Sequence, residues 1–346
     1  MNEMRVRCFD GLKAVSAIIV MLSHYFLCFL RWDWLATVPF VRLLFDGGMA
    51  VFIFIMLSAF GICASLDKDD VKMAIVHVGL KRYFRLSLPL LWPSVLGYLI
   101  CVLGLNYNVA FGTVSNNEWV RTLLPADVAI NQLTSGVAVG VLRGSAFINP
   151  LWMMKYIFLG TFITIPLFFV VNALRKTLYK LVFILIMGIL FYSESIFYAA
   201  IVAGVLLYVV HKMEIRHETV ICAVSVAILV ALELFMANAT HPVMFLKGTL
   251  AIIIVRNGAL VCRSMESAFF QWLNRLSYQI YLVHTIVITS VCSYVYANCE
   301  HNLLNGIGLF FLLVSVVLGL AFVFSKMDCW VSGKMNLLFK KVLPRS

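Results

Sequence analysis

The most prominent pattern along the chain is a series of long apolar runs separated by short polar breaks. A helix needs about 20 consecutive apolar residues to cross the hydrocarbon core of a bilayer. Ten runs approach this length, so the pattern predicts an all-α, polytopic membrane protein with about ten transmembrane helices. The expected spans are residues 12–30, 48–66, 87–105, 151–172, 179–193, 196–210, 219–236, 243–262, 279–298 and 304–325.

The interval between the third and fourth runs is the one long break in this pattern. Residues 106–149 contain polar stretches such as "NNEW" and "INQLTSG", and loops of this length in compact proteins usually have a function of their own. We expect an outward loop that forms an ordered cap. No internal repeat and no soluble domain is evident, so we predict a single transmembrane domain over residues 1–346 that ends in a short basic cytoplasmic tail from residue 326.

The charged residues give this chain an orientation. Only 12% of residues are charged and 63% are hydrophobic, whereas a soluble domain carries about 25% charged residues. If the N-terminus is inside, 21 of the 27 Lys and Arg residues fall in cytoplasmic segments, as the positive-inside rule requires. The net charge of +11 then reflects topology, with both termini cytoplasmic, and calls for no nucleic-acid partner. The outer loops are expected to hold Arg31, Arg42, Arg121, Arg143 and Lys247.

The cysteines give no sign of a metal site. All nine are scattered, most of them within apolar runs, and no CxxC or mixed Cys/His ligand spacing occurs. We therefore expect buried small side chains, with no bound metal and no disulfide framework.

The first apolar run contains an unusual set of ionisable residues. At about 100° per residue, Lys13 and His24 lie within about 20° of the same helix face, and Asp10 lies within about 40° of His24. His24 would lie about 16 Å deeper than Lys13. An ionisable side chain at that depth is unfavourable and usually faces a cavity or a partner. Neutral imidazole can accept and return a proton, which suits a general base.

Five motifs, taken in order, resemble those of the acyltransferase-3 family of integral membrane acyltransferases. The family's opening helix, with a basic residue and then a histidine after ten positions, is matched by "FDGLKAVSAIIVMLSH". "GGMAVFIFIMLSAFGI" is similar to its second helix, although Ala59 stands where the family usually has Gly. Its Arg-x-x-Arg motif, Leu-Trp helix and late Leu-Ser-Tyr-x-x-Tyr-Leu-x-His stretch resemble "KRYFRLSLP", "LWMMKYIFLG" and "RLSYQIYLVH". The matches extend over residues 5–284.

One departure from the family pattern concerns a possible catalytic acid. Many members have a Glu about five residues after the Trp of the Leu-Trp helix, and this chain has Ile157 there. The family's acid therefore has no counterpart on this helix. Lys155, two residues earlier, either serves another role or extends towards the cytoplasm as an anchor.

The resemblance implies a reaction. It points to a membrane O-acetyltransferase that moves an acetyl group from cytoplasmic acetyl-CoA to a hydroxyl of a cell-envelope saccharide, such as an O-antigen, capsule or exopolysaccharide unit. The acceptor would be lipid-linked or at the surface, and the enzyme would lie among the lipids of the bacterial inner membrane. Acetyl-CoA would act as a co-substrate, with no permanently bound cofactor.

The resemblance also assigns roles to residues. His24, with Asp10 and Lys13, would be catalytic, and His24 could act either as a general base or as a nucleophilic relay for the acetyl group. Arg82, Arg85 and Lys13 would bind the donor, because arginine forks suit the phosphates of CoA.

A further group is expected to bind the acceptor or the developing oxyanion, although each member could equally pack within the core. Ser58 could donate a hydrogen bond or simply pack between helices. Trp152 could bind the substrate or anchor the helix at the membrane interface, and the other side chains would line the cavity or pack within the core. The group consists of Ser58, Trp152, Tyr278, Tyr281 and His284.

Two alternatives remain open on sequence grounds. Intramembrane His and Glu residues also suit a proton-coupled transporter or exporter of a glycan or small molecule, although no paired broken helices appear in matching halves. The same family could also transfer another acyl group, such as succinyl. In either case Glu233, inside the seventh span, is expected to have a partner.

Overall fold

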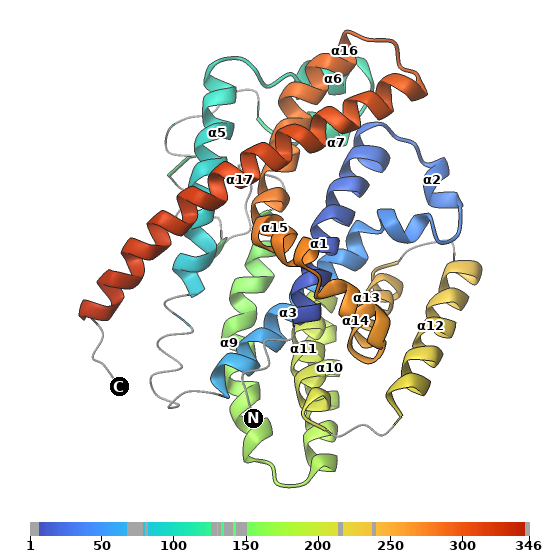
Figure 1. Ribbon diagram of the computed structural model, residues 1–346, viewed down its shortest axis with the longest axis vertical. Helices are drawn as coiled ribbons and strands as arrows, with labels where there is room; N and C mark the ends of the chain where they lie inside the picture. Colours follow the sequence, from blue (N-terminus) through green and yellow to red (C-terminus); the bar gives the residue numbers. More distant parts are fainter. Residues whose placement is uncertain are drawn as a thin grey trace. The chain divides into compact units, whose positions relative to one another are not determined.

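The computed structural model describes residues 7–67, 79, 82–125, 130, 133–134, 141–142, 151–213, 217–236 and 240–342 (Figure 1). Every regular element within these ranges is helical. In chain order they are α1 (Arg7–Leu22), η1 (Ser23–Phe29), α2 (Trp34–Thr37), η2 (Arg42–Phe45), α3 (Gly47–Leu66), η3 (Leu88–Leu90), α5 (Leu91–Val102), α6 (Asn108–Val114), α7 (Glu118–Arg121), α9 (Trp152–Ala173), α10 (Thr177–Glu194), α11 (Ile196–His211), α12 (Glu218–Phe235), α13 (His241–Asn257), α14 (Ala259–Met265), α15 (Ala268–Val287), η5 (Ile288–Cys292), α16 (Ser293–Ala297) and α17 (Leu303–Val342).

The expected all-α, polytopic architecture is confirmed. Among the described residues, eight helical segments are long and apolar enough to cross a membrane. A ninth is added if α13 and α14, which are bent by 94° at their junction, form one broken span. α11 is apolar but only 16 residues long, and the expected number of about ten is reached if it also crosses. The eight segments are Arg7–Phe29, Gly47–Leu66, Arg82–Val102, Trp152–Ala173, Thr177–Glu194, Glu218–Phe235, Ala268–Ala297 and Leu303–Met335.

The described chain divides into two compact units, and each is described by itself. The first unit draws on residues 1–20, 36–82 and 156–274. The second draws on residues 21–35, 83–155 and 275–346.

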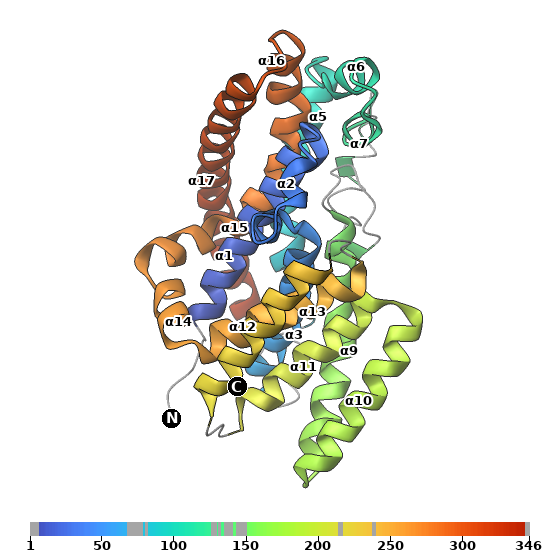
Figure 2. The ribbon, with the colours of Figure 1, turned by 90° about the vertical axis from the view of Figure 1, so that its right-hand side faces the viewer.

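The core of the first unit is built around α3, which packs against α11 and α13. In its most apolar window 72% of α3 is buried, compared with 6% of α10 and 11% of α12. α10 and α11 are separate helices, as predicted, and run side by side from Ser195 (Figure 2). Small residues let the central backbones approach closely, because a Cβ at Gly204 would collide with the carbonyl oxygen of Met56 and with Ala59. α10 and α12 therefore present most of their apolar surface outward, as lipid-facing helices do.

Four buried charges form a closed network in the first unit. Nε of Arg42 lies 2.9 Å from Oε2 of Glu233, and Nζ of Lys247 lies 2.5 Å from Oε1 of the same carboxylate. Lys247 also lies 3.3 Å from Oδ2 of Asp46, the residue that caps the N-terminus of α3. None of the four is more than 6% exposed. Two acids balance two bases, so the network carries no net charge into the apolar interior.

This network confirms one expectation and corrects another. Glu233 has the partners expected of a buried acid. The placement of Lys247 in an outer loop is wrong, because Lys247 is fully buried within α13. Arg42 does lie between two spans, in η2, but it is buried there against Glu233. Positive charge alone does not distinguish a loop residue from the partner of a buried acid.

The second unit gathers α5, α6, α7, α16 and α17, and α6 lies beside α7 and α16 (Figure 1). The side-chain amide of Asn108, fully buried, donates to the carbonyl oxygens of Val120 and Leu124. The hydroxyl of Tyr25 donates to the carbonyl oxygen of Gly306 across 2.8 Å. α17 does not end near residue 325 but continues to Val342, so the expected basic tail prolongs the last helix as far as the described residues reach.

A matched pair of glycines tests the packing of the first unit. Replacing Gly204 with Ala forces a methyl group into the backbone of α3, and we expect a loss of about 1–3 kcal/mol in the free energy of unfolding. Gly204 lies in α11, whereas Gly61 lies in α3. Gly61→Ala meets no heavy atom within 4 Å and should gain about 0.5–1 kcal/mol. Thermal unfolding in detergent would measure both, and equal midpoints for the two variants would contradict the packing.

The ion network gives a second stability prediction. Glu233→Gln removes one of two negative charges and leaves a buried positive charge uncompensated, which should destabilise the fold by about 3–5 kcal/mol. Glu194→Gln, at the exposed end of α10, serves as the control. Indistinguishable unfolding midpoints for the two variants would show that the network contributes nothing to stability.

Candidate active site

Two histidines that are 260 positions apart in the sequence meet in the second unit. His24 lies in the π-helical turn η1, and His284 lies in α15. Nδ1 of His24 is 2.8 Å from Nε2 of His284, and the rings stack with 5.1 Å between centroids and 19° between planes. His284 is fully buried, whereas His24 is half-buried. The pair therefore offers one accessible imidazole held by one inaccessible imidazole.

The hydrogen-bond network assigns the tautomer of each ring. Nδ1 of His284 lies 3.0 Å from the carbonyl oxygen of Ile280, and a carbonyl can only accept, so this nitrogen carries a hydrogen. Nε2 of a neutral His284 is then an acceptor, and it accepts from Nδ1–H of His24. His24 consequently keeps its lone pair at Nε2. No described residue forms a hydrogen bond with that nitrogen. An oriented, unengaged lone pair is the feature that a base or a nucleophile needs.

Both histidines are next to π-helical turns. η1 contains His24, and η5 begins four residues after His284. π-helical turns are rare and occur frequently at functional sites, because the wider turn redirects side chains. The regular spacing of about 100° per residue used for the first helix does not extend beyond Leu22 for this reason. Nothing in the sequence pattern predicted either turn.

A short helix lies against His24. Trp119, in α7, lies with its ring centroid 5.1 Å from that of His24 and at 44° to it. Asn117 caps α7 with its side-chain oxygen, and its amide donates to the carbonyl oxygens of Cys28 and Phe29. These contacts attach α7 to the π-helical turn that carries His24. The sequence predicted an outward, ordered cap over residues 106–149, and this stays a prediction. Of this segment the structure describes α6 and α7 up to residue 125, and most of the remainder lies outside the described residues.

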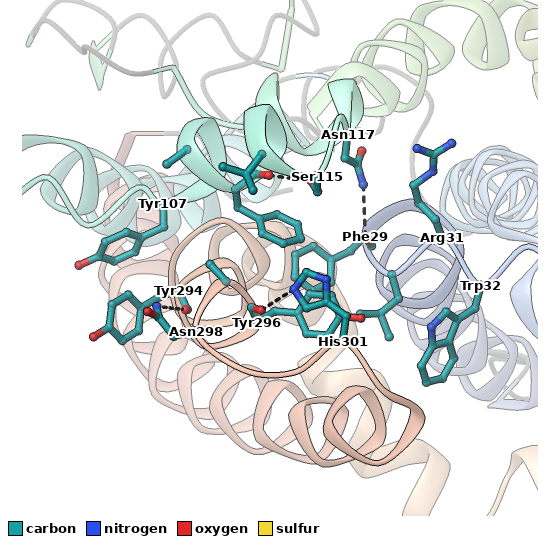
Figure 3. Close-up of a pocket in the computed structure, with 15 residues that line it drawn as sticks. Phe29, Arg31, Trp32, Tyr107, Ser115, Asn117, Tyr294, Tyr296, Asn298 and His301 are labelled. Carbon is teal, nitrogen blue, oxygen red and sulfur yellow. Dashed lines mark hydrogen bonds between the residues drawn. The ribbon is translucent and has the colours of Figure 1, made fainter.

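A cavity opens beside this attachment point. Its volume is about 680 Å³ and its walls come from the end of η1, from α6 and from the segment around α16 (Figure 3). Phe29 and Asn117 line it, so the cavity begins one helical turn away from His24. Small-molecule sites commonly have volumes of about 300–1,000 Å³. Sequence reasoning did not identify this cavity, because its walls are brought together by tertiary packing.

Three other predicted site residues lie in the second unit. The ring of Tyr281 is buried, with its centroid 6.0 Å from that of His284. The hydroxyl of Tyr278 donates to the carbonyl oxygen of Leu86 across 2.8 Å, which favours a packing role for this side chain. Trp152, at the start of α9, is 38% exposed.

The predicted site residues of the first unit form two pairs. Nζ of Lys13 lies 3.5 Å from Oδ1 of Asp10, one helical turn away. The guanidinium of Arg82 donates to the hydroxyl of Ser58, so the predicted donor-binding and oxyanion residues are hydrogen-bonded to each other. Arg85, in the second unit, is exposed. The structure thus brings together Asp10 with Lys13, Ser58 with Arg82, and His24 with His284.

The position of the missing family acid is apolar in the structure. Ile157 is buried in α9 with 8% of its surface exposed, and Lys155 is partly exposed. No carboxylate replaces the absent Glu at this point of the helix. The hydrogen-bond partner of His24 is an imidazole instead.

One cluster within the described residues has metal-ligand chemistry. The ligand atoms of Cys8, Cys262 and Glu266 lie within 4.8 Å of one another. The sequence gave no sign of this group, because Cys8 is far along the chain from Cys262 and Glu266. Sγ of Cys262 lies 3.8 Å from Oε1 of Glu266, so a weak thiol hydrogen bond explains the contact without an ion.

Comparison with known proteins gives one match. The family model described as an acyltransferase domain, that of the acyltransferase-3 family, matches residues 6–326 of this chain. No curated protein and no solved structure matches. The match includes every residue that the sequence singled out for the site.

The tautomer of His24 can be measured directly. In protein labelled with ¹⁵N-histidine we expect Nε2 of His24 to be unprotonated and Nδ1 protonated, because Nδ1 donates to His284. Comparison with a His24→Asn variant identifies the signals among the seven histidines. In His284→Ala the acceptor is lost and both tautomers should be populated. A protonated Nε2 in the unaltered protein at neutral pH would contradict the hydrogen-bond assignment.

Proposed function

Because the chain belongs to the acyltransferase-3 family, we propose that it is a membrane O-acetyltransferase. The donor is cytoplasmic acetyl-CoA, and the acceptor is a hydroxyl of a cell-envelope saccharide. The enzyme acts in the bacterial cytoplasmic membrane, in keeping with its many apolar helices. The family and the multi-pass architecture support acyl transfer in a membrane. The identities of the acyl donor and of the acceptor are proposed in addition.

The observation that carries the proposal is the orientation of the His24 ring. Nδ1 is engaged by His284, and Nε2 retains a lone pair. A cavity of substrate size is lined by Phe29, which ends the same π-helical turn. A histidine that served only to pack helices would satisfy both ring nitrogens or remain buried.

The proposed reaction proceeds as an acyl transfer to oxygen. Nε2 of His24 takes the proton of the acceptor hydroxyl while the hydroxyl oxygen attacks the thioester carbonyl carbon. The tetrahedral intermediate collapses, the carbon–sulfur bond breaks, and the imidazolium returns its proton to the CoA thiolate. His284 accepts the hydrogen bond from Nδ1–H throughout, so the ring keeps its position as Nε2 gains and loses the proton. A relay, in which Nε2 first takes the acetyl group, uses the same lone pair.

The other assignments are supported by chemistry. Arg82, Arg85 and Lys13 supply the positive charge that the phosphates of CoA require. The hydroxyl of Ser58 accepts from Arg82 and keeps its own hydrogen to donate to an oxyanion. Asp10 lies close enough to Lys13 to hold its ammonium group in place.

Transfer of label from acetyl-CoA tests the proposal. Purified protein in liposomes should move radiolabelled acetyl groups onto envelope saccharide, and His24→Ala should reduce the rate by about 100- to 10,000-fold. His217→Ala, an exposed histidine in the first unit, is the matched control and should retain the rate. Saccharide movement across the membrane without labelling would instead favour the transporter, and labelling only from succinyl-CoA would change the acyl group.

The role of His284 has its own readout within this assay. His284→Ala removes the acceptor for Nδ1–H of His24, whereas the amide oxygen of His284→Gln can accept the same hydrogen bond. We expect kcat to fall in the alanine variant, to recover in part in the glutamine variant, and KM for acetyl-CoA to stay unchanged in both. Equal loss in the two variants would reduce His284 to a packing residue.

A further inference from the structure

The cavity in the second unit has the chemical character of a sugar site. Nearly half of its lining residues carry aromatic rings, among them Tyr107, Phe111, Tyr294, Tyr296 and His301 (Figure 3). The rings of Tyr296 and His301 stack with 4.3 Å between centroids and 9° between planes. Pockets of this kind bind a ligand by apolar contact and orient it by a few polar groups. A sugar ring has an apolar C–H face and a polar rim of hydroxyls, and so matches both properties.

The polar groups that are left unengaged in this cavity are suited to hydroxyls. Nε2 of His301 lies 2.9 Å from the carbonyl oxygen of Tyr296 and must donate to it, so Nδ1 of that ring is a free acceptor. The hydroxyls of Tyr107 and Tyr294 have no hydrogen-bond partner among the described residues, and both point to the same side in Figure 3. The two tyrosine rings lie 4.8 Å apart. The residues that line the cavity thus include two tyrosines with unpartnered hydroxyls and a histidine with one free acceptor nitrogen.

The charge of the lining gives a further constraint on the ligand. Arg31 is the one residue with a formal charge among those that line the cavity, and no acid lines it. Its guanidinium has no ion-pair or hydrogen-bond partner among the described residues. Arg31 also adopts a φ of 56°, and Asn116, between two lining residues, adopts a φ of 51°. Non-glycine residues in this region are strained by about 1–3 kcal/mol and cluster at ligand clamps.

We propose that this cavity is the acceptor subsite and that it binds a saccharide unit carrying an anionic group. The inference rests on the proposed function. The sugar ring lies against the aromatic wall formed by Tyr296 and His301, and Tyr107 and Tyr294 bind its hydroxyls. Arg31 binds the anionic group. Phe29 and Asn117 connect the cavity to the turn that carries His24 and to the helix that carries Trp119. In this binding mode one hydroxyl of the bound unit reaches Nε2 of His24.

Two variants with matched controls test the subsite. Tyr294 is 51% exposed, so Tyr294→Ala should fold normally and raise KM for the acceptor about 10-fold, with kcat and KM for acetyl-CoA unchanged. Tyr192→Ala, at 53% exposure on α10 and outside the cavity, should change none of these values. An unchanged acceptor KM in Tyr294→Ala would overturn the subsite.

The binding of an anionic group by Arg31 is tested by comparing acceptors with and without carboxylates. Arg31→Gln should raise KM about 10-fold for an acidic polysaccharide and leave KM unchanged for the same polysaccharide after reduction of its carboxylates. Arg121→Gln, an exposed arginine of α7 that does not line the cavity, is the control. Equal effects on the acidic and the reduced polysaccharide would overturn the role of Arg31. A lipid-diphosphate-linked form of the reduced saccharide shows whether the anion is a phosphate. If it is, Arg31→Gln should raise the KM for this acceptor, which has no carboxylates.

A binding measurement separates this inference from the proposed reaction. The acidic oligosaccharide should raise the Tm of the His24→Ala protein, which is inactive, and the shift should be lost in Tyr294→Ala. A Tm shift without any acetyl transfer by the unaltered protein would contradict the reaction and retain the subsite. Acetyl transfer without a Tyr294-dependent shift would contradict the subsite and retain the reaction.

Discussion

The hydrogen bond between His24 and His284 is the interaction on which the proposed chemistry depends. Alone it contributes only about 1 kcal/mol to stability. Its value lies in direction, because a chain of fixed polarity runs from the carbonyl oxygen of Ile280 through His284 to His24. The carbonyl oxygen can only accept a hydrogen bond, so the position of the hydrogen on each neutral ring follows from it. The backbone of α15 therefore determines which nitrogen of the His24 imidazole carries the lone pair, although His24 is 260 positions away in the sequence.

The rest of the second unit supports this arrangement. His284 is fully buried and cannot exchange its partner for water. Asn117 attaches α7 to the backbone of η1, and Trp119 shields one side of the His24 ring. The π-helical turn gives His24 a direction that a regular helix would not give it. Burial, capping and helix geometry thus hold one side chain in place, which is the kind of preorganisation that acyl transfer requires.

The sequence predicted the architecture well, because a bilayer imposes simple rules. Length and hydropathy were enough to predict the helices, and the separation of α10 from α11 followed from basic residues on both flanks. His24 was singled out because an ionisable side chain inside an apolar run is unfavourable unless it has a partner or a function.

What could not be predicted depends on contacts between distant segments. The pairing of His24 with His284 joins two residues that are 260 positions apart, and no periodicity relates them. The cavity combines side chains from three separate segments. Lys247 was misplaced because its acid partners, Asp46 and Glu233, are close only in the folded chain. Local patterns predict which segments form helices, whereas only tertiary packing determines which polar groups meet.

Chemical modification by diethyl pyrocarbonate, followed by peptide mass spectrometry, tests the central claim most directly, because the reagent attacks an unprotonated and accessible imidazole nitrogen. The hydrogen-bond chain predicts rapid modification of His24, none of His284, and protection of His24 when acetyl-CoA is added. Modification of His284 with His24 inert would show that the lone pair is not where the chain of hydrogen bonds places it.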